Sequence, residues 1–206
     1  MRHRLTCLAL AACATALLLA CRAGTLLPER AIVGLVSIDG FRWDYLERFR
    51  PPALLALAED AVRADGLVPQ FPSKTFPNHH TLVTGLRPAR HGIVSNNMVA
   101  PDIPGRFSLS NREVLADPRW WGGEPIWNTV ERQGRVAGAM FWPGSDASIG
   151  GRRATYWMPY AGEMSNTARV ATILEWLRLP DPQRPSFLTL YFSDVDSAGH
   201  SRGRVR

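Results

Sequence analysis

The sequence predicts an α/β fold built on a mainly parallel sheet, because strand-like apolar runs alternate along it with helix-like segments. The first run, residues 31–38, is continuously apolar, which is typical of a strand buried on both faces. A helical spacing of apolar residues follows over 51–62, with a proline at its start. Strands that alternate with helices in this way form parallel sheets that helices cover on both faces.

Further elements are expected downstream. A short second strand is predicted over 64–69, and a loop with two prolines follows over 70–78. Thr75 lies in this loop and precedes a helix predicted over 78–84, which Gly85 ends. The remaining predicted elements are helices over 125–133 and 165–177 and strands over 136–141 and 187–192.

The N-terminus carries an export signal. Residues 1–21 combine a basic start with a short apolar run that ends at Cys21, which is typical of a signal peptide. No later stretch approaches the ~20 apolar residues that a membrane-spanning helix needs. Residues 18–21 resemble a bacterial lipoprotein cleavage box, in which Cys21 becomes lipidated. We expect an exported bacterial protein, periplasmic or anchored by a lipid on Cys21, with no transmembrane helix in the mature chain.

Charge and cysteine content narrow the function. The net charge of +6 comes from arginines that are spread along the chain without a block, so nucleic acid is not expected as the main partner. The three cysteines, Cys7, Cys13 and Cys21, all lie in the leader, which leaves the mature chain without a disulfide or a thiolate ligand. A metal site must therefore use carboxylates, imidazoles and hydroxyls.

Four places along the chain are candidates for chemistry. Asp39 follows the first strand, Thr75 lies in its loop, and Asn96 comes later in a polar segment; Asp196 and His200 follow the last strand. Open α/β sheets place their sites at the carboxyl ends of strands, and metal hydrolases take oxygen and imidazole ligands from several loops. Each place taken singly also fits an ordinary turn or surface loop, so spacing alone leaves the function open.

Successive segments of the chain resemble motifs of the nucleotide pyrophosphatase/phosphodiesterase family, in the alkaline phosphatase superfamily. Order and spacing both agree from about residue 31 to residue 200, and the Lys-Thr-Phe-Pro-Asn-His element is the most specific. The resemblance implies an alkaline phosphatase-like three-layer α/β/α fold, incomplete at the C-terminus, with residues 28–206 as the N-terminal part of the catalytic domain. The matching segments are Asp39–Arg42, Phe71–His79, Thr84–Gly85, His91–Ile93, Phe141–Asp146 and Asp196–His200.

The resemblance also implies a role for each matching residue. Asp39 and Thr75 would bind one of two zinc ions, and Asp196 and His200 would bind the other. Thr75 would attack phosphorus and become a phosphothreonine, while Asn96 would donate a hydrogen bond to a non-bridging phosphoryl oxygen. A threonine hydroxyl needs such a metal, because it is a weak nucleophile at neutral pH. These roles predict a metal-dependent hydrolase of phosphodiester or pyrophosphate bonds in nucleotides or related small molecules.

Three aromatic residues are expected beside the phosphate site. By resemblance, Phe76, Tyr160 and Tyr191 fall where the family holds the base, or another group beyond the phosphate, between stacking rings. Packing in the core is the alternative for these rings, above all for Tyr160. Lys74, the only lysine, is interpreted as a solvated loop charge, with a phosphate clamp as the alternative.

The chain ends at Arg206, soon after the last motif, whereas family members continue with further metal ligands. We therefore expect a truncated product or a fragment that binds zinc poorly and turns over slowly or not at all, since catalytic zinc sites usually have three protein ligands. One alternative is a phosphate monoesterase of the same superfamily, although the Lys and Arg pair that such enzymes tend to add is not present. Another is a non-catalytic protein that keeps the fold.

Overall fold

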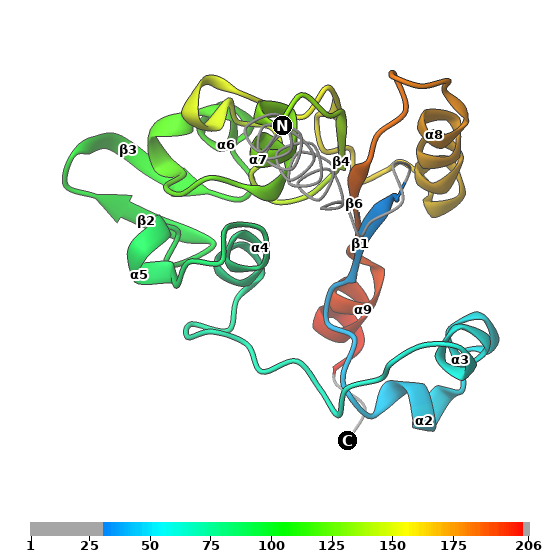
Figure 1. Ribbon diagram of the computed structural model, residues 1–206. Coiled ribbons are helices and arrows are strands. Elements are labelled where there is room, and N and C mark those ends of the chain that lie inside the picture. Colours follow the sequence, from blue (N-terminus) through cyan, green and yellow to red (C-terminus); the bar gives the residue numbers. More distant parts are fainter. Residues whose placement is uncertain (1–30, 204–206) are drawn as a thin grey trace, which may run out of the picture. The chain divides into compact units, whose positions relative to one another are not determined.

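The computed structural model describes residues 31–203, and within this range four parallel strands form the main sheet in the order β1-β6-β4-β5 (Figure 1). From Val33 onward the described residues belong to one compact unit. The predicted signal peptide, residues 1–21, lies outside the described range. The strands of the sheet are β1 (Val33–Ile38), β4 (Ala137–Met140), β5 (Tyr156–Met158) and β6 (Phe187–Phe192).

Helices cover both faces of this sheet, which confirms the predicted α/β class. Helix α7 (Ile126–Arg132) contacts β4 and β6 on one face, and α8 (Asn166–Arg178) contacts the same strands on the other (Figure 1). Helix α4 (Thr75–Thr84) packs beside α7. The other helices are α2 (Tyr45–Phe49), α3 (Pro52–Glu59), α5 (Pro88–His91), α6 (Arg112–Ala116), α9 (Asp194–Arg202) and the 3-10 turns η1 (Pro118–Trp120) and η2 (Ile149–Gly151).

Local sequence signals mark the ends of several helices and strands. Pro125 precedes α7, and the Ser165 hydroxyl caps α8 by accepting from the Ala168 amide at 3.2 Å. The helices predicted over 125–133 and 165–177 and the strands predicted over 136–141 and 187–192 are all confirmed to within one residue at each end. No helix among the described residues has both the length and the apolar character needed to cross a membrane.

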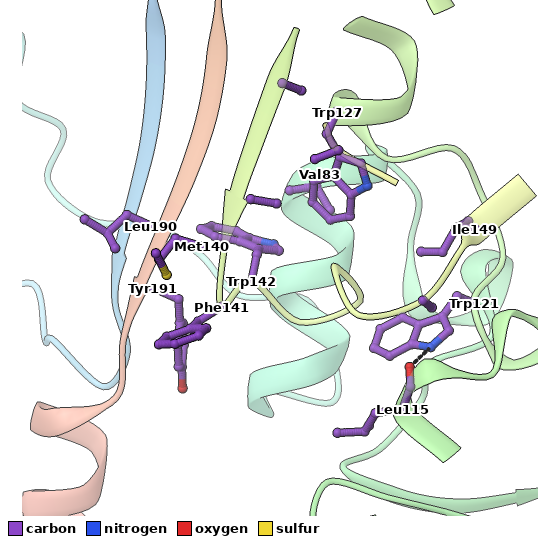
Figure 2. Packing of buried hydrophobic residues seen from close by; sticks show 14 of the residues in the cluster. Val83, Leu115, Trp121, Trp127, Met140, Phe141, Trp142, Ile149, Leu190 and Tyr191 are labelled. Carbon is purple, nitrogen blue, oxygen red and sulfur yellow. Dashed lines mark hydrogen bonds between the residues drawn. The ribbon is translucent and has the colours of Figure 1, made fainter. Parts of the chain in front are cut away.

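The core is rich in aromatic side chains and lies between the sheet, α4 and an antiparallel hairpin. The hairpin consists of β2 (Asn97–Ala100) and β3 (Ile103–Ser108). Figure 2 shows Trp142 lying next to α4, and its Nε1 donates to the His79 carbonyl at 3.0 Å. The Trp121 Nε1 donates to the Leu115 carbonyl at 3.0 Å (Figure 2). These two buried indoles thus keep a hydrogen-bond partner while they fill the core, whereas the Nε1 of the buried Trp127 has none among the described residues.

Three local predictions are wrong. The run 31–38 is not buried on both faces, because β1 lies at an edge of the described sheet, and Val36 is 56% exposed. The segment 64–69 forms no strand, since it pairs with no other strand among the described residues. Thr75 does not precede its helix but is the first residue of α4. Pro77 is tolerated there because amides in the first helical turn need no intrahelical acceptor.

Candidate functional site

A cavity of about 550 Å³ opens at the carboxyl ends of β4 and β6. This is the edge at which open α/β sheets carry their sites. Asp39 is not part of its lining but follows β1 at the same edge. The structure therefore gathers candidate residues that lie far apart in the sequence. The predicted site residues that line the cavity are Thr75, Phe76, Asn96, Tyr160, Tyr191, Asp196 and His200.

Thr75 and Asn96 meet at the start of α4. The Phe76 amide, one of the free N–H groups of the first helical turn, donates to the Asn96 Oδ1 at 3.0 Å. Because this donor is an N–H group, the atom of Asn96 that faces it is the amide oxygen. The contact holds the Asn96 side chain beside Thr75 and leaves its NH₂ group to donate to a ligand of the cavity.

The backbone of Thr75 is tied to the sheet through His79. The Thr75 carbonyl, which can only accept, lies 2.7 Å from the His79 Nδ1. Nδ1 therefore carries the proton, and the Nε2 of the neutral ring accepts from the Ser37 hydroxyl at 2.8 Å. Burial lowers the pKa of His79, which favours the neutral ring. A single side chain thus links the first turn of α4 to β1.

Asp39 is held by a tyrosine and lies close to α9. The Tyr191 hydroxyl donates to the Asp39 Oδ2 at 2.8 Å, and burial together with this carboxylate raises the pKa of Tyr191. Gly40 has a φ of +72°, and a Cβ on it would lie 2.8 Å from the Asp196 Cα. Only glycine allows the turn after β1 to approach α9 so closely. The backbones that carry Asp39 and Asp196 are therefore neighbours.

Asp196 and His200 form the other pair of predicted metal ligands. They lie one turn apart on α9, with the His200 Nε2 3.5 Å from the Asp196 Oδ1. The His200 side chain is 81% exposed, so its ring is free to turn toward a ligand. Within residues 31–203, no three Asp, Glu, His or Cys side chains gather closely enough to hold a metal ion.

Aromatic rings form much of the remaining wall. Phe76 lies against Trp121, with ring centroids 6.0 Å apart, and Tyr160 lies against Phe141 at 5.3 Å. Figure 2 shows Phe141 and Tyr191 side by side at the ends of their strands. All these rings line the cavity, so they are placed where a flat group of a substrate could bind between them. Their role in binding stays a prediction.

Phe141, which lines the cavity, and Arg169, which packs behind it, were not predicted. Phe141 adopts a φ of 60°, a strained conformation for a bulky residue that is concentrated at functional sites. Arg169 is only 2% exposed, donates to the Tyr191 carbonyl at 3.2 Å, and has its guanidinium carbon 5.0 Å from the Phe141 ring centroid. Phe141 belongs to a segment that carries the family resemblance, whereas Arg169 sits in an ordinary helical pattern and gave no signal.

A charged pair closes the side of the cavity beyond the rings. The Arg112 guanidinium lies 3.6 Å from the Asp146 carboxylate and donates to the Tyr160 carbonyl. Burial raises the pKa of Asp146, although Arg112 acts against this rise. Arg112 and Asp146 therefore add a polar feature to an otherwise aromatic wall, and neither was among the predicted site residues.

A comparison of the sequence with models of protein families matches residues 33–204 to the family described as type I phosphodiesterase / nucleotide pyrophosphatase. Ectonucleotide pyrophosphatase/phosphodiesterase family member 3 of Mus musculus is 42% identical over 196 residues, which are 94% of this chain and 22% of that protein. An uncharacterized pyrophosphatase/phosphodiesterase of Schizosaccharomyces pombe is 45% identical over 175 residues, which are 84% of this chain and 36% of that protein.

Solved structures agree with these matches. Murine ectonucleotide pyrophosphatase/phosphodiesterase 5 superposes with a TM-score of 0.79 at 39% identity, over 85% of this chain and 46% of that chain. An inactive threonine-to-alanine variant of the same murine protein, in complex with AMP, superposes with a TM-score of 0.80 at 38% identity. The match confirms the alkaline phosphatase-like α/β fold. The chain spans less than half the length of these relatives.

Proposed function

Because the chain belongs to the type I phosphodiesterase / nucleotide pyrophosphatase family, we propose that it hydrolyses phosphodiester or pyrophosphate bonds in nucleotides or related small molecules. One observation carries this proposal: Thr75 opens α4 on the wall of the cavity, with Asn96 fixed beside it. The inactive threonine-to-alanine variant of the murine relative, which holds AMP, supports both a reacting threonine and a nucleotide substrate.

In the proposed reaction the Thr75 hydroxyl oxygen attacks phosphorus, and the hydroxyl proton passes to solvent. The bond from phosphorus to the leaving oxygen breaks, which leaves a phosphothreonine. Water then attacks the same phosphorus, the bond to the Thr75 oxygen breaks, this oxygen takes up a proton that the water has lost, and the phosphate product departs. The NH₂ group of Asn96 donates to a non-bridging oxygen on which charge increases in the transition state. The positive end of the α4 dipole favours the same charge.

Two zinc ions are the proposed cofactor, and the donor atoms fit them. Asp39, Thr75, Asp196 and His200 offer carboxylate, hydroxyl and imidazole donors, which zinc binds in proteins. The close approach of Gly40 to Asp196 makes the backbones that carry the two carboxylates neighbours. Bound zinc would favour the alkoxide of Thr75 and neutralise the leaving oxygen. Since no group of three metal-binding side chains forms among the described residues, we expect weak zinc binding and slow turnover.

The test is the release of p-nitrophenolate from bis-p-nitrophenyl phosphate, measured on the purified chain at saturating zinc. We expect slow, zinc-dependent release that falls at least about 100-fold in Thr75→Ala, because the variant lacks the proposed attacking oxygen. Thr155→Ala, which changes an exposed threonine outside the cavity, is the matched control. Equal rates for Thr75→Ala and the control would contradict the proposal. Faster release from p-nitrophenyl phosphate would favour the monoesterase instead.

We further propose that the chain is exported and anchored to the membrane by a lipid on Cys21. The composition of residues 1–21 supports both parts of this proposal, and the prefix "ecto" in the names of the relatives agrees with export. Expression in a bacterium followed by separation of membrane and soluble fractions tests the anchor. We expect the chain in the membrane fraction and Cys21→Ala in the soluble fraction; identical distributions would argue against lipidation.

A further inference from the structure

We propose that Tyr191 and His79 form a buried brace that fixes the Asp39 carboxylate relative to the Thr75 backbone. The inference rests on the proposed function, which makes Asp39 and Thr75 the donors to one metal ion. Neither Tyr191 nor His79 would touch the metal. Both would act as positioning residues, in the way that hydrogen-bond partners behind metal ligands orient those ligands.

The first half of the brace is the contact between Tyr191 and Asp39. The Tyr191 hydroxyl donates to the Asp39 Oδ2 at 2.8 Å, which leaves the Oδ1 of the carboxylate for a ligand. Tyr191 is only 7% exposed, so its ring has little room to turn. The family resemblance predicts a substrate-binding ring at this position. The structure adds a second use for the same residue, which depends on the hydroxyl and not on the ring.

The second half of the brace is the contact of His79 with Thr75. His79 donates from Nδ1 to the Thr75 carbonyl at 2.7 Å and accepts at Nε2 from Ser37 at 2.8 Å. The first turn of α4 is thereby attached to β1, the strand that Asp39 follows. Both nitrogens of this buried ring have partners, so its orientation is well determined.

The two halves touch each other. The rings of His79 and Tyr191 meet edge to face, with centroids 5.1 Å apart and an interplanar angle of 83°. Ser37 and Tyr191 are paired in register between the parallel strands β1 and β6, so their side chains share one face of the sheet. A change at either half is therefore transmitted to the other through direct contact. Asp39 and the Thr75 carbonyl are therefore joined through contacts to the neighbouring strands β1 and β6.

Calorimetric titration of the purified chain with Zn²⁺ alone tests the brace without any need for turnover. Tyr191→Phe keeps the ring and removes the hydroxyl, and we expect it to weaken zinc binding about 10-fold or more. Ser37→Ala cuts His79 from β1, and we expect a smaller loss of the same sign. Tyr156→Phe is the matched control, because its hydroxyl donates to the Gln183 carbonyl away from the cavity.

Asp39→Asn separates failure of the brace from failure of the proposed function. If Asp39→Asn weakens zinc binding while Tyr191→Phe matches Tyr156→Phe, the brace is wrong and the metal assignment stands. If Asp39→Asn also leaves zinc binding unchanged, the metal assignment fails and the brace fails with it. Thermal unfolding without zinc completes the test, since a purely structural role of Tyr191 would lower stability and leave zinc affinity unchanged.

Discussion

The two walls of the cavity are held in different ways. Helix α4, which starts at Thr75, buries four of its residues. Helix α9, which carries Asp196 and His200, buries none, and no residue of the described segment 41–73 is buried either. The wall with the proposed nucleophile is thus preformed by core packing. The wall with the second pair of proposed metal ligands depends on a few close contacts, above all the one at Gly40.

The largest loss of stability is expected from Trp121→Ala, which changes the packed wall that carries Thr75. Trp121 is 4% exposed and lies against Phe76, His80 and Phe107. Its removal leaves a cavity behind the Thr75 turn, and we expect the free energy of unfolding to fall by about 3–5 kcal/mol. Chemical denaturation followed by circular dichroism measures this loss, since the method does not depend on the indole that is removed.

Trp43→Ala is the matched change on the other side. Trp43 is 69% exposed in the segment without buried residues, so we expect a change of about 0.5 kcal/mol or less. Similar losses for Trp43→Ala and Trp121→Ala would show that the described contrast between the two regions does not hold in solution.

The stability that the packed wall provides should also decrease at acidic pH. Burial lowers the pKa of His80 from 6.5 to about 4, because its ring is enclosed by Trp121 and His91. The unfolded chain therefore takes up this proton at higher pH than the folded chain does. Stability is full above pH 6.5 and falls as the pH drops toward about 4, by an amount on the order of 3 kcal/mol. Urea unfolding at a series of pH values measures the slope.

His80→Gln isolates this contribution. The glutamine amide keeps a donor for the Gly122 carbonyl, which the His80 Nε2 contacts at 2.8 Å, but it does not titrate. Burial also lowers the pKa of His79 and His91, so some acid sensitivity should remain in the variant. A slope as steep as in the unchanged chain would show that His80 is not the titrating group.

Local signals predicted much of this architecture. The strand at 187–192 is an apolar run that only Thr189 interrupts, and this strand and the helix at 165–177 were both placed to within one residue. Thr75 and Asp196 were expected together because the ends of parallel strands share one edge. The segment 64–69 failed because β propensity forms a strand only where a partner is available.

The contacts between side chains inside the site could not be predicted from one sequence. The hydrogen bond from Tyr191 to Asp39 joins residues 152 positions apart and exists because β1 and β6 are neighbours in the sheet. The alternation of strands and helices indicates a parallel sheet but does not determine the strand order. The exposure of β1 was missed for the same reason, since apolar content does not reveal whether a strand lies at an edge.

A smaller loss of stability than that of Trp121→Ala, but the most informative result for α9, is expected from Gly40→Ala. The added methyl group meets backbone atoms of Asp196 and strains a φ of +72°. We expect a loss of about 1–2 kcal/mol in the free energy of unfolding, because α9 has no buried residues and can move away from the methyl group. Hydrogen exchange should accelerate in 194–202 and not in 75–84, and zinc affinity should fall.

Gly134→Ala separates the clash from the strain. Gly134 has a φ of +75°, and a Cβ there meets nothing within 4 Å. The Gly134→Ala variant should therefore be destabilised about as much as Gly40→Ala, through backbone strain alone. Hydrogen exchange in α9 and zinc affinity should stay unchanged. If both variants accelerate exchange in α9 equally, the contact between Gly40 and Asp196 does not hold this wall, and another contact must position Asp196 and His200.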